Sequence, residues 1–220
     1  MSVPVIAIDG PSASGKGAVA KRVARTLGFH YLESGALYRL VALGALTGSL
    51  RDEITLARQA GSMEVEFQDD RIFLSKQDVT DALRTEDCSN RASEVAKLSL
   101  VRQQLLKRQR AFREPPGLVA DGRDMGTVVF PDAVLKIFLT ASPEVRAERR
   151  YKQLKEKGIN ANLRALSRDL QERDARDATR AVAPLIAATD SQVLDSTALS
   201  IEAVVERVLQ LFRERTTGGR

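Results

Sequence analysis

A glycine-rich segment near the N-terminus combines residue types that hold phosphate. Backbone N–H groups in such a loop point inward, and Lys16 adds a mobile positive charge for the outer phosphates. We therefore expect this segment to bind the phosphates of a ligand, through Gly10, Pro11, Ser12, Ala13, Ser14, Gly15, Lys16, Gly17 and Ala18.

The loop departs from the common phosphate-loop pattern at one place. Gly17 stands where a serine or threonine hydroxyl usually contacts Mg²⁺, and Ala18 brings no hydroxyl in compensation. We expect Mg²⁺ to be held mainly by the nucleotide phosphates and by water, with no protein metal site. Asp9 and Asp121, each expected at a strand end, either act on the metal through water or are structural residues that cap turns or pair with arginines.

The elements around the loop suit this chemistry. An almost continuous apolar run, Val3 to Asp9, predicts a buried parallel strand before it, and the segment from Ala18 to Leu27 predicts a helix after it. A helix that begins at the loop adds the positive end of its dipole to the phosphate site. A chance glycine-rich surface turn is the less favoured alternative.

Further apolar runs predict more buried strands of the same sheet, at Gly117–Asp121, Val134–Leu139 and Gln192–Asp195. An amphipathic stripe from Ser200 to Phe212 predicts a helix after the last of them. Strands that alternate with helices indicate an α/β fold, a parallel sheet flanked by helices.

Two segments do not follow this alternation. Residues 63–76 alternate apolar and polar side chains on either side of Asp69 and Asp70, which predicts a small antiparallel hairpin inserted into the domain. The charged segment 146–180 is predicted to be helical, with a break at 158–162. Its composition favours a solvated pair of helices, and its place after a core strand leaves a mobile lid as the alternative.

Composition limits the class of protein. The 220 residues include 34 Lys and Arg against 29 Asp and Glu, a net charge of +5 that is spread along the chain. This distribution favours arginines aimed at individual phosphates over a surface that binds nucleic acid. Cys88 is the one cysteine and His30 the one histidine, so neither a disulfide nor a histidine-based triad is expected. No stretch has the length of a membrane span or the pattern of a secretory signal, and we expect a cytoplasmic protein.

Several segments, in this order and spacing, make the chain resemble the bacterial cytidylate kinases nearly from end to end. They are the glycine-rich loop, Ser34-Gly-Ala-Leu-Tyr-Arg39, Asp121-Gly-Arg-Asp-Met-Gly-Thr127, and the stretch from Glu172 to Leu185. The resemblance implies one P-loop kinase domain over 1–220, with an antiparallel insertion that binds the nucleoside monophosphate at 61–90 and a helical lid at 146–180. It also implies transfer of the γ-phosphoryl group of ATP, with Mg²⁺, to CMP or dCMP by a monomer that has no nucleic-acid or membrane partner.

The resemblance assigns roles residue by residue. It implies that Lys16, Arg123 and Arg180 are catalytic. It implies that the acceptor nucleotide is bound by Ser34, Tyr38, Arg39, Ser93, Arg102, Arg123, Asp124, Arg173, Asp177 and Arg180.

Within that set, the family match places Arg39 and Arg123 on the acceptor phosphate. Asp124 matches the position that reads the exocyclic amine of cytosine, with Ser93 and Arg102 in the same base pocket, because a carboxylate is a natural acceptor for that amine. A pairing of Asp124 with a neighbouring arginine is the structural alternative.

Arg173 and Asp177 match the residues that read the ribose, and an ion pair on a solvated helix is the alternative for them. Helical spacing puts Arg173, Asp177 and Arg180 on one face. Arg149 and Arg150 are further candidates to supply charge in the transition state.

Other functions remain open from the residues. A related P-loop kinase acting on UMP or on a non-nucleotide alcohol is the nearest, and Asp124 disfavours UMP because uracil has a carbonyl where cytosine has an amine. A GTP-dependent switch is disfavoured because the Asn-Lys-x-Asp guanine signature does not occur in the chain.

Overall fold

The computed structural model describes residues 2–47, 52–68, 71–156 and 158–217. The chain separates into two compact units. The first unit comprises Met1–Leu32 and Phe112–Arg220, and the second comprises Glu33–Ala111. The second unit is thus an insertion into the sequence of the first.

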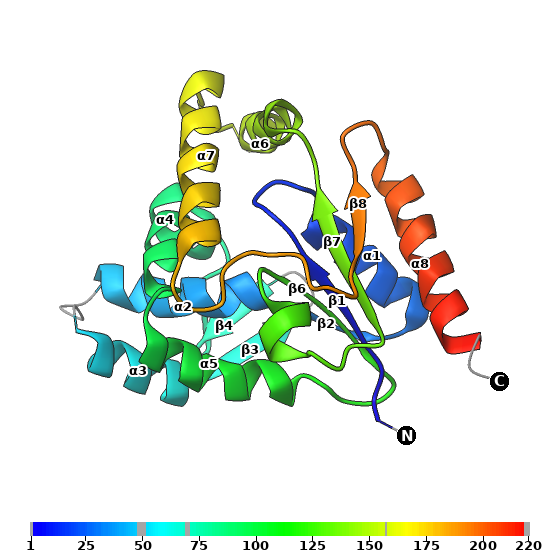
Figure 1. Ribbon diagram of the computed structural model, residues 1–220. Helices are drawn as coiled ribbons and strands as arrows, with labels where there is room; N and C mark the ends of the chain where they lie inside the picture. Colours follow the sequence, from blue (N-terminus) through cyan, green and yellow to red (C-terminus); the bar gives the residue numbers. More distant parts are fainter. Residues whose placement is uncertain (1, 48–51, 69–70, 157, 218–220) are drawn as a thin grey trace. The chain divides into compact units, whose positions relative to one another are not determined.

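The first unit is built on a five-stranded sheet with the order β2-β6-β1-β7-β8 (Figure 1). Its strands are β1 (Val5–Asp9), β2 (His30–Glu33), β6 (Leu118–Gly122), β7 (Leu135–Thr140) and β8 (Gln192–Asp195). The pairs β1–β6, β1–β7 and β7–β8 are all parallel. The predicted parallel α/β sheet is therefore confirmed.

Register brings the chemically important strand ends together. Ile8 of β1 pairs with Asp121 of β6, and Asp9 pairs with Gly122. The glycine-rich loop follows β1 and Arg123 follows β6, so the carboxyl ends of parallel strands place both at one edge of the sheet.

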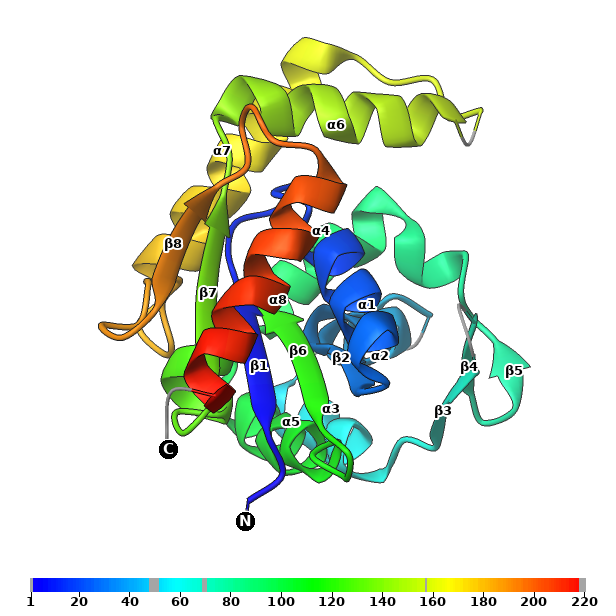
Figure 2. The same cartoon turned by 90° about the vertical axis from the view of Figure 1, so that its right-hand side faces the viewer.

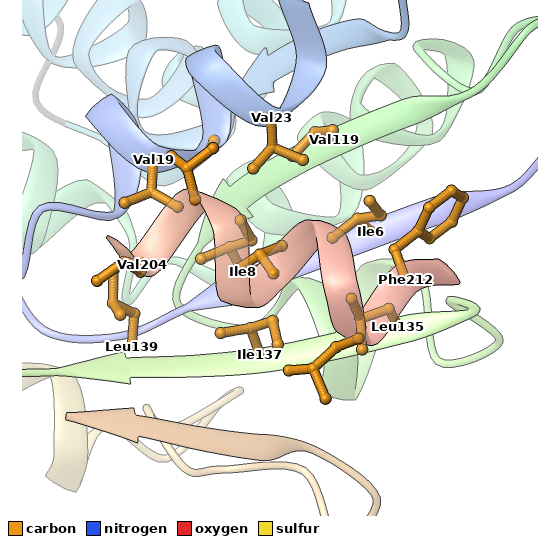
Figure 3. Close-up of a cluster of buried hydrophobic side chains, with 14 of the residues drawn as sticks. Ile6, Ile8, Val19, Val23, Val119, Leu135, Ile137, Leu139, Val204 and Phe212 are labelled. Atoms are coloured by element: carbon orange, nitrogen blue, oxygen red, sulfur yellow. The ribbon is translucent and has the colours of Figure 1, made fainter. Parts of the chain in front are cut away.

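Two helices cover one face of this sheet, α1 (Lys16–Leu27) and α8 (Ile201–Thr217), as Figure 2 shows. Their apolar faces meet β1, β6 and β7 in a closed hydrophobic core (Figure 3). The core includes Ile6, Ile8, Val19, Val23, Val119, Leu135, Ile137, Leu139, Val204, Val208 and Phe212. The predicted amphipathic stripe of α8 supplies its buried face, as expected.

The remaining elements of the first unit follow β6 and β7. A π-helical turn, η2 (Met125–Val129), comes after β6, and α6 (Pro143–Glu156) and α7 (Leu163–Thr179) come between β7 and β8. The charged segment expected to be helical is thus a pair of helices. Among the described helices, none combines the length and apolar character that a membrane crossing requires.

Two strands of the sheet differ from the sequence expectations. Strand β2 was not predicted, because four residues beginning with an exposed histidine give a weak apolar pattern. Strand β8 was predicted to be buried like β1, but Val193 is 61% exposed. The physical reason is that β8 is an edge strand, where the sheet leaves one face partly open to water.

The second unit is mainly helical. It contains α2 (Ser34–Thr47), α3 (Glu53–Ser62), α4 (Glu86–Val95), α5 (Ser99–Ala111) and a 3₁₀ turn, η1 (Ala82–Arg84). The predicted hairpin is present as β3 (Val65–Gln68) paired antiparallel with β4 (Arg71–Leu74), and β5 (Gln77–Asp78) adds an unpredicted third strand. The predicted turn at Asp69 and Asp70 lies outside the described residues.

Candidate active site

The glycine-rich loop has a backbone that requires glycine at two positions. Gly10 has a φ of 153°, and a Cβ there would lie 2.0 Å from the carbonyl oxygen of Leu139. Gly15, with a φ of 92°, immediately precedes α1, whose first turn has no acidic residue. The initial N–H groups of α1 and its dipole are thus directed at the loop, an arrangement that attracts an anion.

Lys16 lies inside this loop. The residue is buried, and its ammonium group donates a hydrogen bond to the carbonyl oxygen of Pro11 at 2.9 Å. Burial, followed by the positive charge of Arg123, lowers the pKa of Lys16 to about 7. A phosphate bound beside Lys16 would offset both effects, so the loop favours an anionic ligand.

Arg123 connects the loop to α7. Its Nη2 donates to the Ser12 hydroxyl at 2.8 Å, its Nη1 to the Gly122 carbonyl at 3.3 Å, and its Nε to Asp177 Oδ2 at 2.7 Å. Burial opposes ionisation of Asp177, but the charge and hydrogen bond of Arg123 overcome it and lower the pKa of that carboxyl. A guanidinium held in this way beside a phosphate loop is oriented in advance for an anion.

The two aspartates at the strand ends have different surroundings. Asp9 accepts hydrogen bonds from the backbone N–H groups of Met125 and Gly126, each at 2.8 Å, and burial raises its pKa to about 6 despite these bonds. Asp9 therefore holds η2, the structural role that the sequence left open for it.

Asp121 faces the phosphate loop instead. Its Oδ1 accepts a hydrogen bond from the Tyr31 hydroxyl at 2.9 Å, and its Oδ2 would lie 3.6 Å from a Cβ at Gly17. Asp121 thus lies next to the position where other phosphate loops present a metal-binding hydroxyl. Within the described part of the chain, no three metal-ligating side chains gather in one place.

The end of α7 supplies further charge. Asp177 is buried in the helix, whereas Arg180 lies just beyond it, because the helix ends at Thr179. The expectation that Arg173, Asp177 and Arg180 share a helical face is therefore wrong for Arg180. Its extended backbone nevertheless leaves it buried, and its Nε donates to the Ala183 carbonyl. Burial has the largest effect on the pKa of Asp177 and raises it, whereas Arg123 lowers it most. The charges of Arg173 and Arg180 lower this pKa further.

The arginines of α6 are not equivalent. Arg149 donates to the Ser14 carbonyl at 3.2 Å and to the carbonyl of Ser196 at 2.6 Å, which joins α6 to the phosphate loop and to the end of β8. Arg150 contacts Gln153 of its own helix at 3.5 Å.

Arg146, which sequence analysis assigned no role, is also bonded to the loop, through the Ser12 carbonyl at 3.2 Å. Its one distinguishing sequence signal is its place in the first turn of α6, six residues after β7 ends, at the same sheet edge as the loop.

Asp124 is buried directly after Arg123 and precedes η2. Its backbone carbonyl accepts hydrogen bonds from Val128 at 2.9 Å and Val129 at 3.1 Å, which hold the residue in place. A buried carboxylate fixed by its backbone is suited to accept a hydrogen bond from a base amine.

The second unit contains the other predicted acceptor residues. Ser34 begins α2, and both Ser34 and Tyr38 are buried. The Arg39 guanidinium pairs with Glu33, and the Arg39 carbonyl accepts a hydrogen bond from the Cys88 thiol at 3.4 Å. Burial raises the pKa of Cys88, so this thiol is a poor nucleophile and supports packing instead.

Ser93 and Arg102, predicted to share a base pocket, are also buried in this unit. The Arg102 guanidinium lies 5.8 Å from the centre of the Tyr38 ring and donates to the Ala96 carbonyl at 3.4 Å. The Ser93 hydroxyl is buried, and among the described residues it has no hydrogen-bond partner. A buried hydroxyl of this kind is available to a ligand.

The structure thus gathers the predicted residues into two sets, one in each unit. The first unit holds the loop with Arg123, Asp124, Arg173, Asp177 and Arg180. The second holds Ser34, Tyr38, Arg39, Ser93 and Arg102. His30, to which no chemistry was assigned, contacts the Pro115 carbonyl through Nε2 at 2.9 Å, outside both sets.

Comparison with known proteins identifies relatives over almost the whole chain. Residues 6–214 match the family model described as cytidylate kinase. A cytidylate kinase of Bordetella bronchiseptica is 58% identical over 214 residues, which cover 96% of each chain. A cytidylate kinase of Chromobacterium violaceum is 55% identical and covers 100% of each chain.

A solved structure shares the fold at low sequence identity. An uncharacterized protein from Eubacterium ventriosum has a TM-score of 0.56 at 11% identity, with 96% of this chain and 99% of that chain covered. This likeness concerns the fold alone.

Proposed function

The chain belongs to the cytidylate kinase family, and we propose that it transfers the γ-phosphoryl group of ATP to CMP or dCMP, giving ADP and CDP or dCDP. The observation that carries the proposal is the concentration of positive charge at the phosphate loop, where the buried Lys16 begins α1 and Arg123 bonds the Ser12 hydroxyl. Phosphoryl transfer is catalysed mainly by positioning and by stabilisation of charge, which this arrangement supplies.

The reaction requires no strong general base from the protein. An oxygen of the acceptor phosphate, which is already ionised near neutral pH, attacks the γ-phosphorus while the bond from that phosphorus to the β-phosphate oxygen breaks. We assign Lys16, with the loop from Gly10 to Ala18, to the phosphates of ATP. Arg123 and Arg180 neutralise the charge that spreads over the transferred group.

Mg²⁺ bound to the ATP phosphates supplies additional charge neutralisation in such reactions. The residues present fit an ion held mainly by phosphate and water, since Gly17 offers no hydroxyl and the Asp121 carboxylate lies beside that position. We assign Asp121 to a water of that ion and exclude Asp9, because both of its oxygens already accept backbone N–H groups.

The match to the family assigns the contacts of the acceptor residue by residue. Ser34, Tyr38 and Arg39 hold its phosphate end together with Arg123. Ser93, Arg102 and Asp124 read the cytosine.

Arg173 and Asp177 read the ribose. Because Asp177 already bonds Arg123, it also orients the arginine that contacts the phosphate. Removal of Asp177 should therefore change the ratio of CMP to dCMP turnover and lower both rates.

The proposal also covers the assembly and setting of the enzyme. We assign 61–90 as the insertion that contributes to acceptor binding and 146–180 as a lid that closes over the phosphates. The enzyme acts as a cytoplasmic monomer, and neither nucleic acid nor a membrane takes part.

A coupled assay of ADP release across CMP, dCMP, UMP, AMP and GMP tests this function. We expect CMP and dCMP to be the preferred acceptors, because a carboxylate at position 124 pairs with an amine and repels the carbonyl of uracil. Equal rates with UMP would contradict the assignment of Asp124, and no release with any acceptor would contradict the proposed reaction.

A further inference from the structure

Ser12 is held at both of its oxygen atoms by arginines from outside the loop. Arg123 donates to its hydroxyl at 2.8 Å, and Arg146 donates to its carbonyl at 3.2 Å. The two arginines come from distant parts of the sequence, one after β6 and one in α6. Ser12 is thereby the residue of the phosphate loop at which these elements meet.

Both arginines are anchored by carboxylates of α7. Arg123 pairs with Asp177 at 2.7 Å, and Arg146 pairs with Asp174 at 2.6 Å. The two aspartates are three residues apart in the helix, so they lie on one face and direct both arginines toward the same loop residue.

Arg146 is the more deeply fixed of the two. Its side chain is 7% exposed, and its Nε also donates to the Ala141 carbonyl at 3.1 Å, where β7 leads into α6. Three acceptors from three segments leave its guanidinium little freedom. A buried arginine satisfied in this way is a rigid support for whatever it touches.

We propose that Arg146, anchored by Asp174, is a positioning residue for phosphoryl transfer. It holds the Ser12 carbonyl and so fixes the Ser12 hydroxyl against which Arg123 is aligned. Arg146 does not touch substrate in this inference, which rests on the proposed kinase activity. Loss of this support displaces Arg123 and the loop N–H groups relative to the phosphates.

The experiment compares Arg146→Ala with Arg113→Ala. Arg113 is a matched control in the same unit, because its Nε donates to the Val3 carbonyl at 2.8 Å and its Nη1 pairs with Asp132 at 2.7 Å, near the opposite end of β1. We expect Arg146→Ala to lower kcat by on the order of 100-fold, because a misplacement of the reacting groups by about 1 Å causes a rate loss of this size. Arg113→Ala should lower the melting temperature but keep kcat within about twofold of wild type, as a change remote from the reacting groups.

A double-mutant cycle with Ser12→Ala separates positioning from general stability. Ser12→Ala removes the hydroxyl that aligns Arg123, so Arg146→Ala should reduce kcat far less in that background than in the wild type. Multiplicative losses would overturn the proposal, as would equal kcat for Arg146→Ala and Arg113→Ala.

Two conservative variants cover the case in which Arg146→Ala does not fold. Arg146→Lys, which keeps the charge but cannot reach three acceptors at once, should recover part of the rate, and Asp174→Asn should lower kcat less than Arg146→Ala. Wild-type kcat in both folded variants would overturn the proposal. Inactivity of the wild-type protein on CMP would instead refute the proposed function, so the two failures are distinguishable.

Discussion

The two units hold their functional side chains in contrasting ways. In the first unit, charged groups lie close together beside the loop, since Arg123 pairs with the buried Asp177 and its positive charge acts on the buried Lys16. In the second unit, the buried set is mostly hydroxyl and aromatic, and the Arg39–Glu33 pair is partly exposed.

The contrast follows from the donor triphosphate, which the proposal assigns to the first unit alone, whereas residues of both sets are assigned to the acceptor. A triphosphate concentrates negative charge, so its site needs buried cations, whose desolvation appears as the lowered pKa of Lys16. A nucleoside presents amine, carbonyl and hydroxyl groups, which side chains such as Ser93 and Tyr38 can match at little electrostatic cost. Changes in the first unit should therefore affect the rate far more than changes in the second.

The largest expected effect is that of Lys16→Ala. Loss of the ammonium group removes charge stabilisation from the transferred phosphoryl group and should lower kcat by about 100- to 1,000-fold, as removal of one preorganised donor does in other enzymes. The melting temperature should not fall, because a buried cation with a lowered pKa costs stability at neutral pH. Steady-state kinetics and calorimetry check both statements, and a rate near that of the wild type would remove the loop from the mechanism.

Asp124→Ala should have the next largest effect. Loss of the carboxylate that reads the cytosine amine should raise the KM for CMP by about 5- to 150-fold, from the roughly 1–3 kcal/mol of a good base contact. The KM for ATP should hardly change. Asp124→Asn is the control of equal size, and similar losses for CMP and ATP would show that Asp124 supports the site as a whole.

The pH dependence of ADP binding is a direct test of the buried charge. A neighbouring phosphate raises the pKa of Lys16 from about 7, so ADP binding above that pH must take up a proton. Linkage then makes affinity fall as pH rises from 7 to 9, by at most about tenfold per pH unit.

Titration calorimetry in buffers of different ionisation enthalpy measures this uptake. Lys16→Met should abolish it. The same proton uptake in wild type and variant would assign the effect to another group.

The smallest effect is expected in the second unit, from Glu33→Gln. The Glu33 side chain is 35% exposed, so its pair with Arg39 should contribute little, roughly 0.2–1 kcal/mol. The KM for CMP should rise by no more than about fivefold, the equivalent of that energy. A loss as large as that of Asp124→Ala would show that charge matters equally in both units.

The predictability of the fold depended on how strongly each segment is patterned. Strands β1, β6 and β7 were predictable because they are buried on both faces and read as apolar runs, and α8 because its stripe is regular. Strand β2 was missed because its four residues carry little apolar signal. The end of α7 at Thr179 was missed because helix boundaries depend on local backbone geometry that composition reflects weakly.

The candidate site also contains a part that the sequence predicts and a part that it does not. The loop from Gly10 to Ala18 could be read from the chain because its chemistry resides in consecutive backbone groups. The partners of Asp9, Arg123 and Arg146 could not, since they are contacts between segments far apart in the sequence. Sequence also left Asp9 and Asp121 equivalent, and only their hydrogen bonds distinguish them.

By itself, then, the sequence determined the phosphate loop, the parallel α/β class and the family. Each of these follows from the local order of the residues, that is, from the spacing of glycines, from apolar runs and from the sequence of motifs along the chain. The tertiary structure decided which charges meet, by making Asp177 the partner of Arg123 and placing Arg146 on Ser12. Pairing of buried charges depends on distance and desolvation, which arise only when the chain brings distant segments together.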